Sequence, residues 1–294
     1  MDTSRLKYRW HPDFASAPTL VLAFGGWNDA GEAATGSVLW LRDELDAEPF
    51  VEIAGDAYYD FQQVRPIVTV EDGLVREVTW PRVTLSATSS GTGSPIVLGH
   101  GFEPQYLWPD FCADLVQVAT DCGAGGIVFL GSLLADVPHT RPSPLVATAS
   151  SDAVRIRTGI EGANYIGPTG IVGAAAKAFA DAGFETVSIW ASASHYVSAE
   201  ANPNAMLSLL EKVREVCGVD VDTGALNATV QSWRAKVDEA MEDHPDVAAY
   251  VRMLERRVDS GGDGPAPLRA EDLPSGDELA AEFQRFLRDH GEEG

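Results

Sequence analysis

Acidic, basic and imidazole side chains gather in three stretches of the sequence, each of which directly follows an apolar run. Asp29 follows the first run and His195 follows the third. Between them, Asp136, His139 and Arg141 follow the second run. A carboxylate, an imidazole and a guanidinium that meet at one edge of a fold can bind an anion or carry out general acid-base catalysis. We therefore take Asp136, His139 and His195 as the candidate catalytic residues.

A wider set of residues is expected to line a ligand pocket around these groups. Pro138, Pro142 and Pro144 stiffen the second stretch and exclude a helix from it, so its polar side chains are held in place. Glu103, close in sequence to Trp108, is a candidate for the pocket wall. The candidate pocket residues are Gly26, Trp27, Asn28, Asp29, Glu103, Asp136, His139, Thr140, Arg141 and His195.

A purely structural interpretation of the same residues stands beside the chemical one. In it, Asp29 caps a helix, Asp136 pairs with Arg141 to fix the loop, and both histidines are partly buried and hydrogen-bonded. The sequence contains no G-x-S-x-G, Walker, H-E-x-x-H or dinucleotide-binding motif. No two histidines or cysteines stand at metal-ligand spacing, so we expect neither a metal nor a cofactor.

The three apolar runs predict buried parallel strands that bring these side chains to one edge of a sheet. Residues 19–31 read as a strand, a glycine turn and the start of an amphipathic helix. Residues 126–130 and 186–191 are two further strands, and helices alternate with them. Because ligands in open α/β sheets bind beyond the carboxyl ends of the strands, this edge is the predicted site.

Outside this region the sequence predicts a hairpin, a long helical extension and a flexible linker. Residues 67–80 form the hairpin around Asp72-Gly73, and residues 102–104 are expected to open a helix. The predicted divisions are an α/β domain at 1–218, a helical hairpin at 219–259, a linker at 260–275, and a last helix with an acidic tail at 276–294.

Composition limits the partners of this chain. Its 294 residues are 45% hydrophobic and carry a net charge of -23, which argues against nucleic acid or an anionic membrane as a partner. The N-terminal residues lack the apolar segment of a secretory signal, and no run is long enough to span a membrane. We expect a cytoplasmic protein with three reduced, structural cysteines.

Five collinear stretches resemble the proteasome assembly chaperone 2 family in its actinobacterial-like branch. They are LAFGGWNDAGEAATG at 22–36, GFEPQYLWPDF at 101–111, LGSLLADVPHTRPSP at 130–144, NYIGPTGIVG at 164–173 and ASHYVSAEANPNAMLSLL at 193–210. The resemblance implies a three-layer α/β/α sandwich with a mostly parallel sheet, similar to nucleoside phosphorylases. It also implies self-association, for example into trimers, and contact with proteasome α subunits, and it implies no catalytic residues.

Two hypotheses of function follow. The first is a non-catalytic homo-oligomer that assists proteasome assembly, with the helical extension used for oligomer or partner contacts. The alternative is a small-molecule-binding protein or a hydrolase-like or phosphorylase-like enzyme that uses the crevice at the carboxyl ends of the strands.

Overall fold

An eight-stranded mixed sheet forms the centre of the computed structural model, which describes residues 5–88, 94–159, 165–197, 201–242 and 244–260. The predicted last helix lies outside these residues, as does the predicted linker apart from Ser260. In spatial order the strands of the sheet are β1 (Leu6–Tyr8), β3 (Glu48–Ala54), β6 (Arg82–Ala87), β7 (Ile96–Phe102), β2 (Thr19–Gly25), β8 (Gly126–Ala135), β10 (Thr186–Ser194) and β9 (Leu145–Ala149).

The four strands at the centre are parallel, and the flanking strands are antiparallel. β2 pairs in parallel with β7 and β8, and β8 pairs in parallel with β10. On the outside, β9, β6, β3 and β1 are added in antiparallel fashion. The predicted α/β fold is therefore confirmed, with the parallel character confined to the strands that carry the candidate residues.

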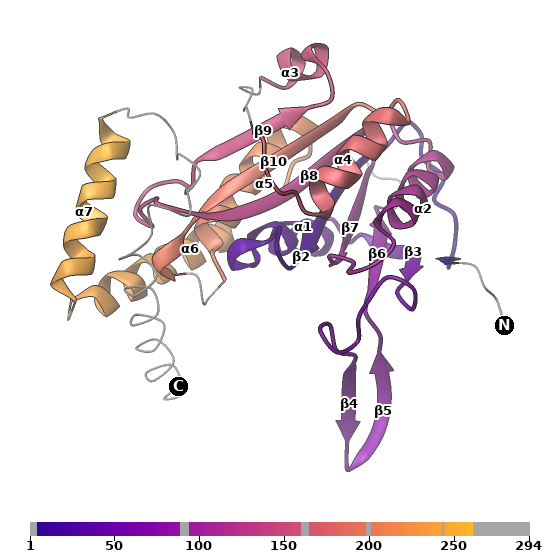
Figure 1. Cartoon of the computed structure of the whole chain (residues 1–294), viewed down its shortest axis with the longest axis horizontal. Helices are drawn as coiled ribbons and strands as arrows, with labels where there is room; N and C mark the ends of the chain where they lie inside the picture. The colour runs from indigo at the N-terminus through magenta and orange to yellow at the C-terminus, as the bar shows by residue number, and fades with distance from the viewer. Residues whose placement is uncertain (1–4, 89–93, 160–164, 198–200, 243, 261–294) are drawn as a thin grey trace.

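Helices cover both faces of this sheet (Figure 1). α1 and α5 pack on one face and α2 and α4 on the other, so two separate apolar cores form. The helical elements are η1 (Ala30–Glu32), α1 (Ala33–Glu44), α2 (Trp108–Asp121), α3 (Asp152–Thr158), α4 (Ile171–Asp181), η2 (His195–Val197), α5 (Pro203–Cys217), α6 (Gly224–Met241) and α7 (Pro245–Asp259).

Local signals explain where the helix after β10 begins and ends. Asn202 accepts a hydrogen bond from the main-chain amide of Ala205 at 3.0 Å, and Pro203 occupies the first turn, where its missing amide costs nothing. Gly218 ends α5 in the left-handed conformation with φ 65°. This helix lies where the sequence places it.

Three boundaries differ from the sequence prediction. The helix expected at residues 102–104 begins at Trp108, because β7 continues to Phe102, which pairs with Gly25 of β2. Both β8 and β10 run further than predicted, to Ala135 and Ser194, because their last residues pair with each other. Pairing with a neighbouring strand sets the ends of β7, β8 and β10. The local sequence pattern contains no record of that pairing.

The C-terminal helices α6 and α7 form the predicted helix pair, and a third apolar cluster holds them to η2, which directly follows β10. Trp233 and Val237 of α6 and Val251 and Leu254 of α7 are buried together with Tyr196. α6 also packs on α5. The division of the chain into domains stays a prediction.

The predicted hairpin is a separate two-stranded arm made of β4 (Ile67–Glu71) and β5 (Leu74–Thr79). Figure 1 shows the arm projecting away from the layered body. Asp72 and Gly73 both have positive φ at its turn, as the Asp-Gly pair predicts.

Candidate functional site

The candidate residues lie at the carboxyl end of the parallel strands, as predicted, but they form two groups. We call the first the Asn28 group; its members are Gly26, Trp27, Asn28, Asp29 and Glu103. We call the second the His139 group; its members are Asp136, His139, Thr140, Arg141 and His195. The link between the two groups is β8, because Ser132 donates its main-chain amide to the carbonyl oxygen of Asn28 at 2.9 Å.

In the Asn28 group, a carboxylate of the chain itself occupies the N-terminus of α4. Glu103 Oε1 accepts the main-chain amide of Ile171 at 2.7 Å and the side-chain amide of Asn28 at 2.9 Å. A negative charge is favoured at this end of a helix. The place where an external anion would bind is therefore filled by Glu103, which ties the end of β7 to α4.

Asn28 is fully buried, and its Oδ1 atom has no hydrogen-bond donor. That oxygen faces Gly170, where an added Cβ atom would lie only 2.2 Å from it. Gly26 has φ 107°, which lets the chain turn sharply out of β2 and brings the next side chain, Trp27, to the surface with 64% exposure. Gly26 and Trp27 thus form a turn that leaves an indole exposed.

Asp29 caps α1 across the short η1 turn. Its carboxylate accepts the main-chain amide of Ala34 at 2.7 Å, the amide and hydroxyl of Thr35, and the hydroxyl of Ser132 at 3.3 Å. Burial raises the pKa of Asp29, while these hydrogen bonds favour the ionised form. The capping role proposed from the sequence is present.

In the His139 group, the imidazole of His139 is completely buried between η2 and α6. Its main-chain amide donates to the Tyr196 hydroxyl at 2.8 Å, and its Nδ1 lies 2.8 Å from the same oxygen. Nε2 lies 3.2 Å from Asp238 Oδ1 on α6. A neutral ring with its proton on Nε2 satisfies all three contacts, and burial accordingly lowers the pKa of His139, although Asp238 opposes the shift.

Asp136 and His195 face α7. Asp136 Oδ1 accepts the Tyr250 hydroxyl at 2.6 Å, and His195 Nδ1 lies 3.2 Å from the same oxygen. The His195–Asp136 contact has the distance of an ion pair but not the angle of a hydrogen bond. Asp136 and His195 are therefore engaged with each other, and Asp136 is also bound to α7.

Thr140 and Arg141 complete the contact with α7. The Thr140 hydroxyl donates to Glu255 at 2.6 Å, and Arg141 makes a two-pronged ion pair with Asp259 at 2.9 and 2.8 Å. The Asp136–Arg141 pair expected from the sequence does not form, because each side chain finds its partner on α7. The loop that carries Thr140 and Arg141 is therefore fixed by its contacts with α7.

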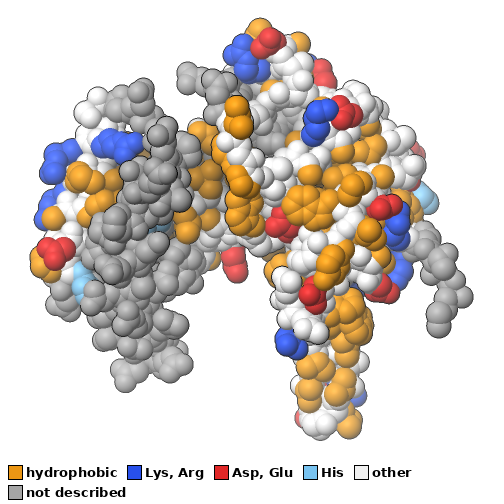
Figure 2. Space-filling view, viewed as in Figure 1, with side chains coloured by type: hydrophobic (Ala, Val, Ile, Leu, Met, Phe, Trp, Pro, Cys, Tyr) orange, Lys and Arg blue, Asp and Glu red, His pale blue; other side chains and the backbone are white. Residues whose placement is uncertain are grey.

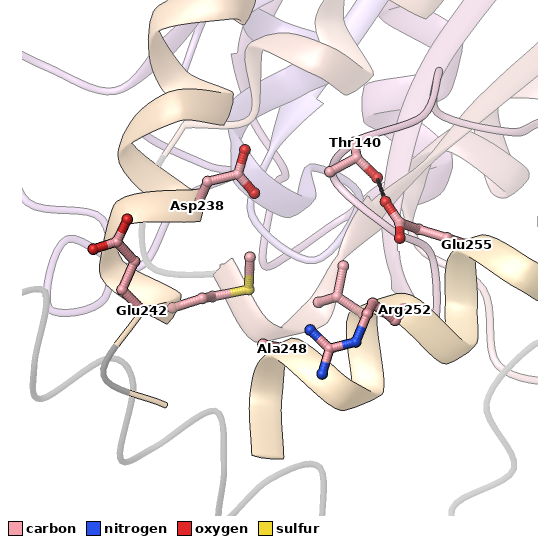
Figure 3. Close-up of a pocket in the computed structure, with 8 residues that line it drawn as sticks. Thr140, Asp238, Glu242, Ala248, Arg252 and Glu255 are labelled. Carbon is pink, nitrogen blue, oxygen red and sulfur yellow. Dashed lines mark hydrogen bonds between the residues drawn. The ribbon is translucent and has the colours of Figure 1, made fainter. Parts of the chain in front are cut away.

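A shallow hollow of about 230 Å³ lies between α6 and α7 (Figure 3). Of the candidate residues, only Thr140 lines it. Asp238 and Glu242 project from the α6 side and Ala248, Arg252 and Glu255 from α7. Met241 and Val251 complete the lining. That the candidate residues bind a ligand stays a prediction.

Sequence reasoning missed the partners of the His139 group. The partners all lie on the extension, 99 to 118 residues from the residues that they contact: Asp238, Tyr250, Glu255 and Asp259. The four-residue interval between Glu255 and Asp259 was the available signal, because it places two carboxylates on one helix face.

Two features are absent from the described residues. No group of three or more histidine, cysteine or acidic side chains in the described ranges is arranged to hold a metal ion. Among the helices of the same ranges, none has the length and apolar character needed to cross a bilayer.

The chain is similar to known proteins in sequence and in structure. The family model described as the PAC2 family matches residues 23–241. No curated protein matches the chain. A proteasome-assembly chaperone homologue from Mycobacterium tuberculosis is 40% identical, with a TM-score of 0.74, over 79% of this chain and 99% of its own.

Two further solved structures widen the comparison. A PAC2 family protein from Streptomyces avermitilis is 39% identical, with a TM-score of 0.73, over 80% of this chain and 99% of its own. PbaB of Pyrococcus furiosus, described as an archaeal proteasome activator, shares the fold with a TM-score of 0.65 at 13% identity, over 81% of this chain and 98% of its own.

Proposed function

Because the chain belongs to the PAC2 family, we propose that it is a non-catalytic, cytoplasmic homo-oligomer that assists the assembly of proteasome α subunits. Three copies are the expected number. Membership of the family is consistent with a partner related to the proteasome. The description of the Mycobacterium tuberculosis relative as a proteasome-assembly chaperone homologue supports the same choice.

One observation about the candidate site favours this function over an enzyme. Four members of the His139 group each contact a polar residue of α6 or α7, and the fifth, His195, contacts Asp136 and the ring of Tyr250 on α7. In the Asn28 group, Glu103 fills the helix N-terminus. A ligand that bound these polar groups would have to compete with their internal contacts, which supports a scaffold on which larger partners assemble.

The test is assembly of purified proteasome α subunits from the same organism, with and without this protein. We expect a stoichiometric complex in native mass spectrometry and faster formation of α rings on native gels. A chain that neither binds α subunits at about 10 µM nor changes the rate of ring formation would refute the proposal.

A variant separates the enzyme alternative from the chaperone. Asp136→Asn keeps an oxygen that accepts from the Tyr250 hydroxyl but removes the carboxylate. A chaperone should assemble rings at the wild-type rate with this substitution. If the protein purified from its host instead retains one small molecule per subunit, and Asp136→Asn loses that molecule, the crevice is a ligand site and the enzyme alternative is favoured.

A further inference from the structure

The arm formed by β4 and β5 is the described part of the chain with the least support from the rest of the fold. Its two strands pair with each other, and neither belongs to the eight-stranded sheet. An isolated two-stranded hairpin is only marginally stable in water. In Figure 1 it stands away from the body, so its stability calls for a surface beyond this chain.

The side chains of the arm are unusually apolar for such an exposed position. Val68 lies opposite Val78, and Val70 lies opposite Val75, which forms two cross-strand valine pairs. Figure 2 shows hydrophobic side chains along its length. Seven large apolar residues of the arm and its foot are 43–68% exposed: Ile67, Val68, Val70, Leu74, Val75, Val78 and Trp80.

A second exposed apolar surface lies near the foot of the arm. We call it the base patch, and its members are Trp27, Phe102, Tyr106 and Leu107, each at least half exposed. The segment at the foot of the arm holds this patch in place. Tyr59 donates its hydroxyl to the Phe102 carbonyl at 2.7 Å, and the Tyr106 hydroxyl lies 3.4 Å from Asp60.

We propose that the arm of one copy lies on the base patch of a second copy of this chain. The inference rests on the self-association included in the proposed function and names the surfaces that produce it. One chain carries both halves of the contact, so copies can join head to tail into a closed ring or embrace as a pair. Binding of the arm to a different protein would account for the exposed apolar side chains of the arm, but not for those of the base patch.

Charge limits where two copies can meet, and the valines supply an uncharged area for the contact. Two chains of net charge -23 repel each other, so a contact between them requires surface without charge, and the valine pairs provide it. On the valine side of the arm, the four valines expose on the order of 400 Å² of apolar surface, about half of the roughly 800 Å² that each partner contributes to an interface of standard size.

The test compares two double variants that add the same charge to the same two strands. Val70→Lys with Val78→Lys places ammonium groups on the valine pairs. Thr69→Lys with Thr79→Lys is the matched control, because these residues alternate with the valines along each strand and so point to the opposite side. Sedimentation velocity over a range of concentrations gives the dissociation constant, and a thermal melt of each variant checks that the body remains folded.

We expect the valine variant to raise the dissociation constant at least about 100-fold and the threonine variant to leave it within about threefold. A photo-crosslinker at position 75 should join heavy-isotope and light-isotope copies, with the second attachment at the base patch. Self-association that increases between 50 and 500 mM salt would agree, since salt screens the repulsion between copies.

The outcomes distinguish this inference from the proposed function. A wild-type chain that stays monomeric at 100 µM refutes the homo-oligomer and the arm contact together. An oligomer that both double variants form equally well refutes the arm contact alone. If the valine variant keeps its oligomer but loses binding to α subunits, the arm belongs to the proteasome and the second-copy assignment is wrong.

Discussion

Glu103→Ala tests the observation that Glu103 is a structural cap of α4 and not a free wall of a ligand pocket. The substitution removes the oxygen that accepts both the main-chain amide of Ile171 and the side-chain amide of Asn28. Asn28 is completely buried, so its amide gains no water in exchange. The change therefore leaves two donors without an acceptor.

The magnitude follows from these two donors. A buried donor left unsatisfied costs about 1–3 kcal/mol, and the loss of a helix cap costs about 0.5–2 kcal/mol. We expect Glu103→Ala to lower the free energy of unfolding by about 2–4 kcal/mol. Glu103→Gln keeps an amide oxygen in the same place and loses only the favourable charge at the helix end, worth about 0.3–1 kcal/mol.

The assay is urea unfolding followed by circular dichroism at one fixed protein concentration, because self-association would make stability depend on concentration. Asn28→Ala and the double variant complete a thermodynamic cycle, in which we expect a coupling of about 1 kcal/mol. If Glu103→Ala stays within about 0.5 kcal/mol of the wild type, the cap is not a stabilising feature, and Glu103 becomes a stronger candidate for ligand binding.

Three further predictions concern the same edge of the sheet. In the same urea titration, Gly170→Ala should lower the free energy of unfolding by about 2–3 kcal/mol, because the added carbon would lie 2.2 Å from Asn28 Oδ1. The control Gly218→Ala should cost only about 1 kcal/mol, because its added carbon meets open space and the only penalty is its φ of 65°. Burial lowers the pKa of His139, so below about pH 6.5 the unfolded chain binds more protons than the folded chain. In titrations from pH 8 to 5, the wild type should therefore lose stability more steeply than His139→Gln. Arg141→Ala should change the free energy of global unfolding by less than about 1 kcal/mol, because its ion pairs are partly exposed. Amide hydrogen exchange should nevertheless become faster in the last turns of α7. Unchanged exchange there would show that the ion pairs do not hold the helix.

Local pattern in the sequence was enough to find most of the secondary structure around the site. The apolar run at β2 and the Asp-Gly turn of the arm predicted those elements, since alternation and turn chemistry act over a few residues. Asp29 as a cap was found for the same reason, because its amide partners follow within six residues. The α/β fold and the family resemblance rest on signals of this local kind.

Contacts between distant segments decided the rest. Asp136 stands five residues from Arg141, and the sequence favoured a pair between them, whereas the fold gives Asp136 to Tyr250 and Arg141 to Asp259, each more than 110 residues away. The same is true of Glu103, whose role as a cap depends on where α4 docks. Spacing along the chain records which face of an element is buried, but the hydrogen-bond partners of a polar loop are set only when separate elements pack together.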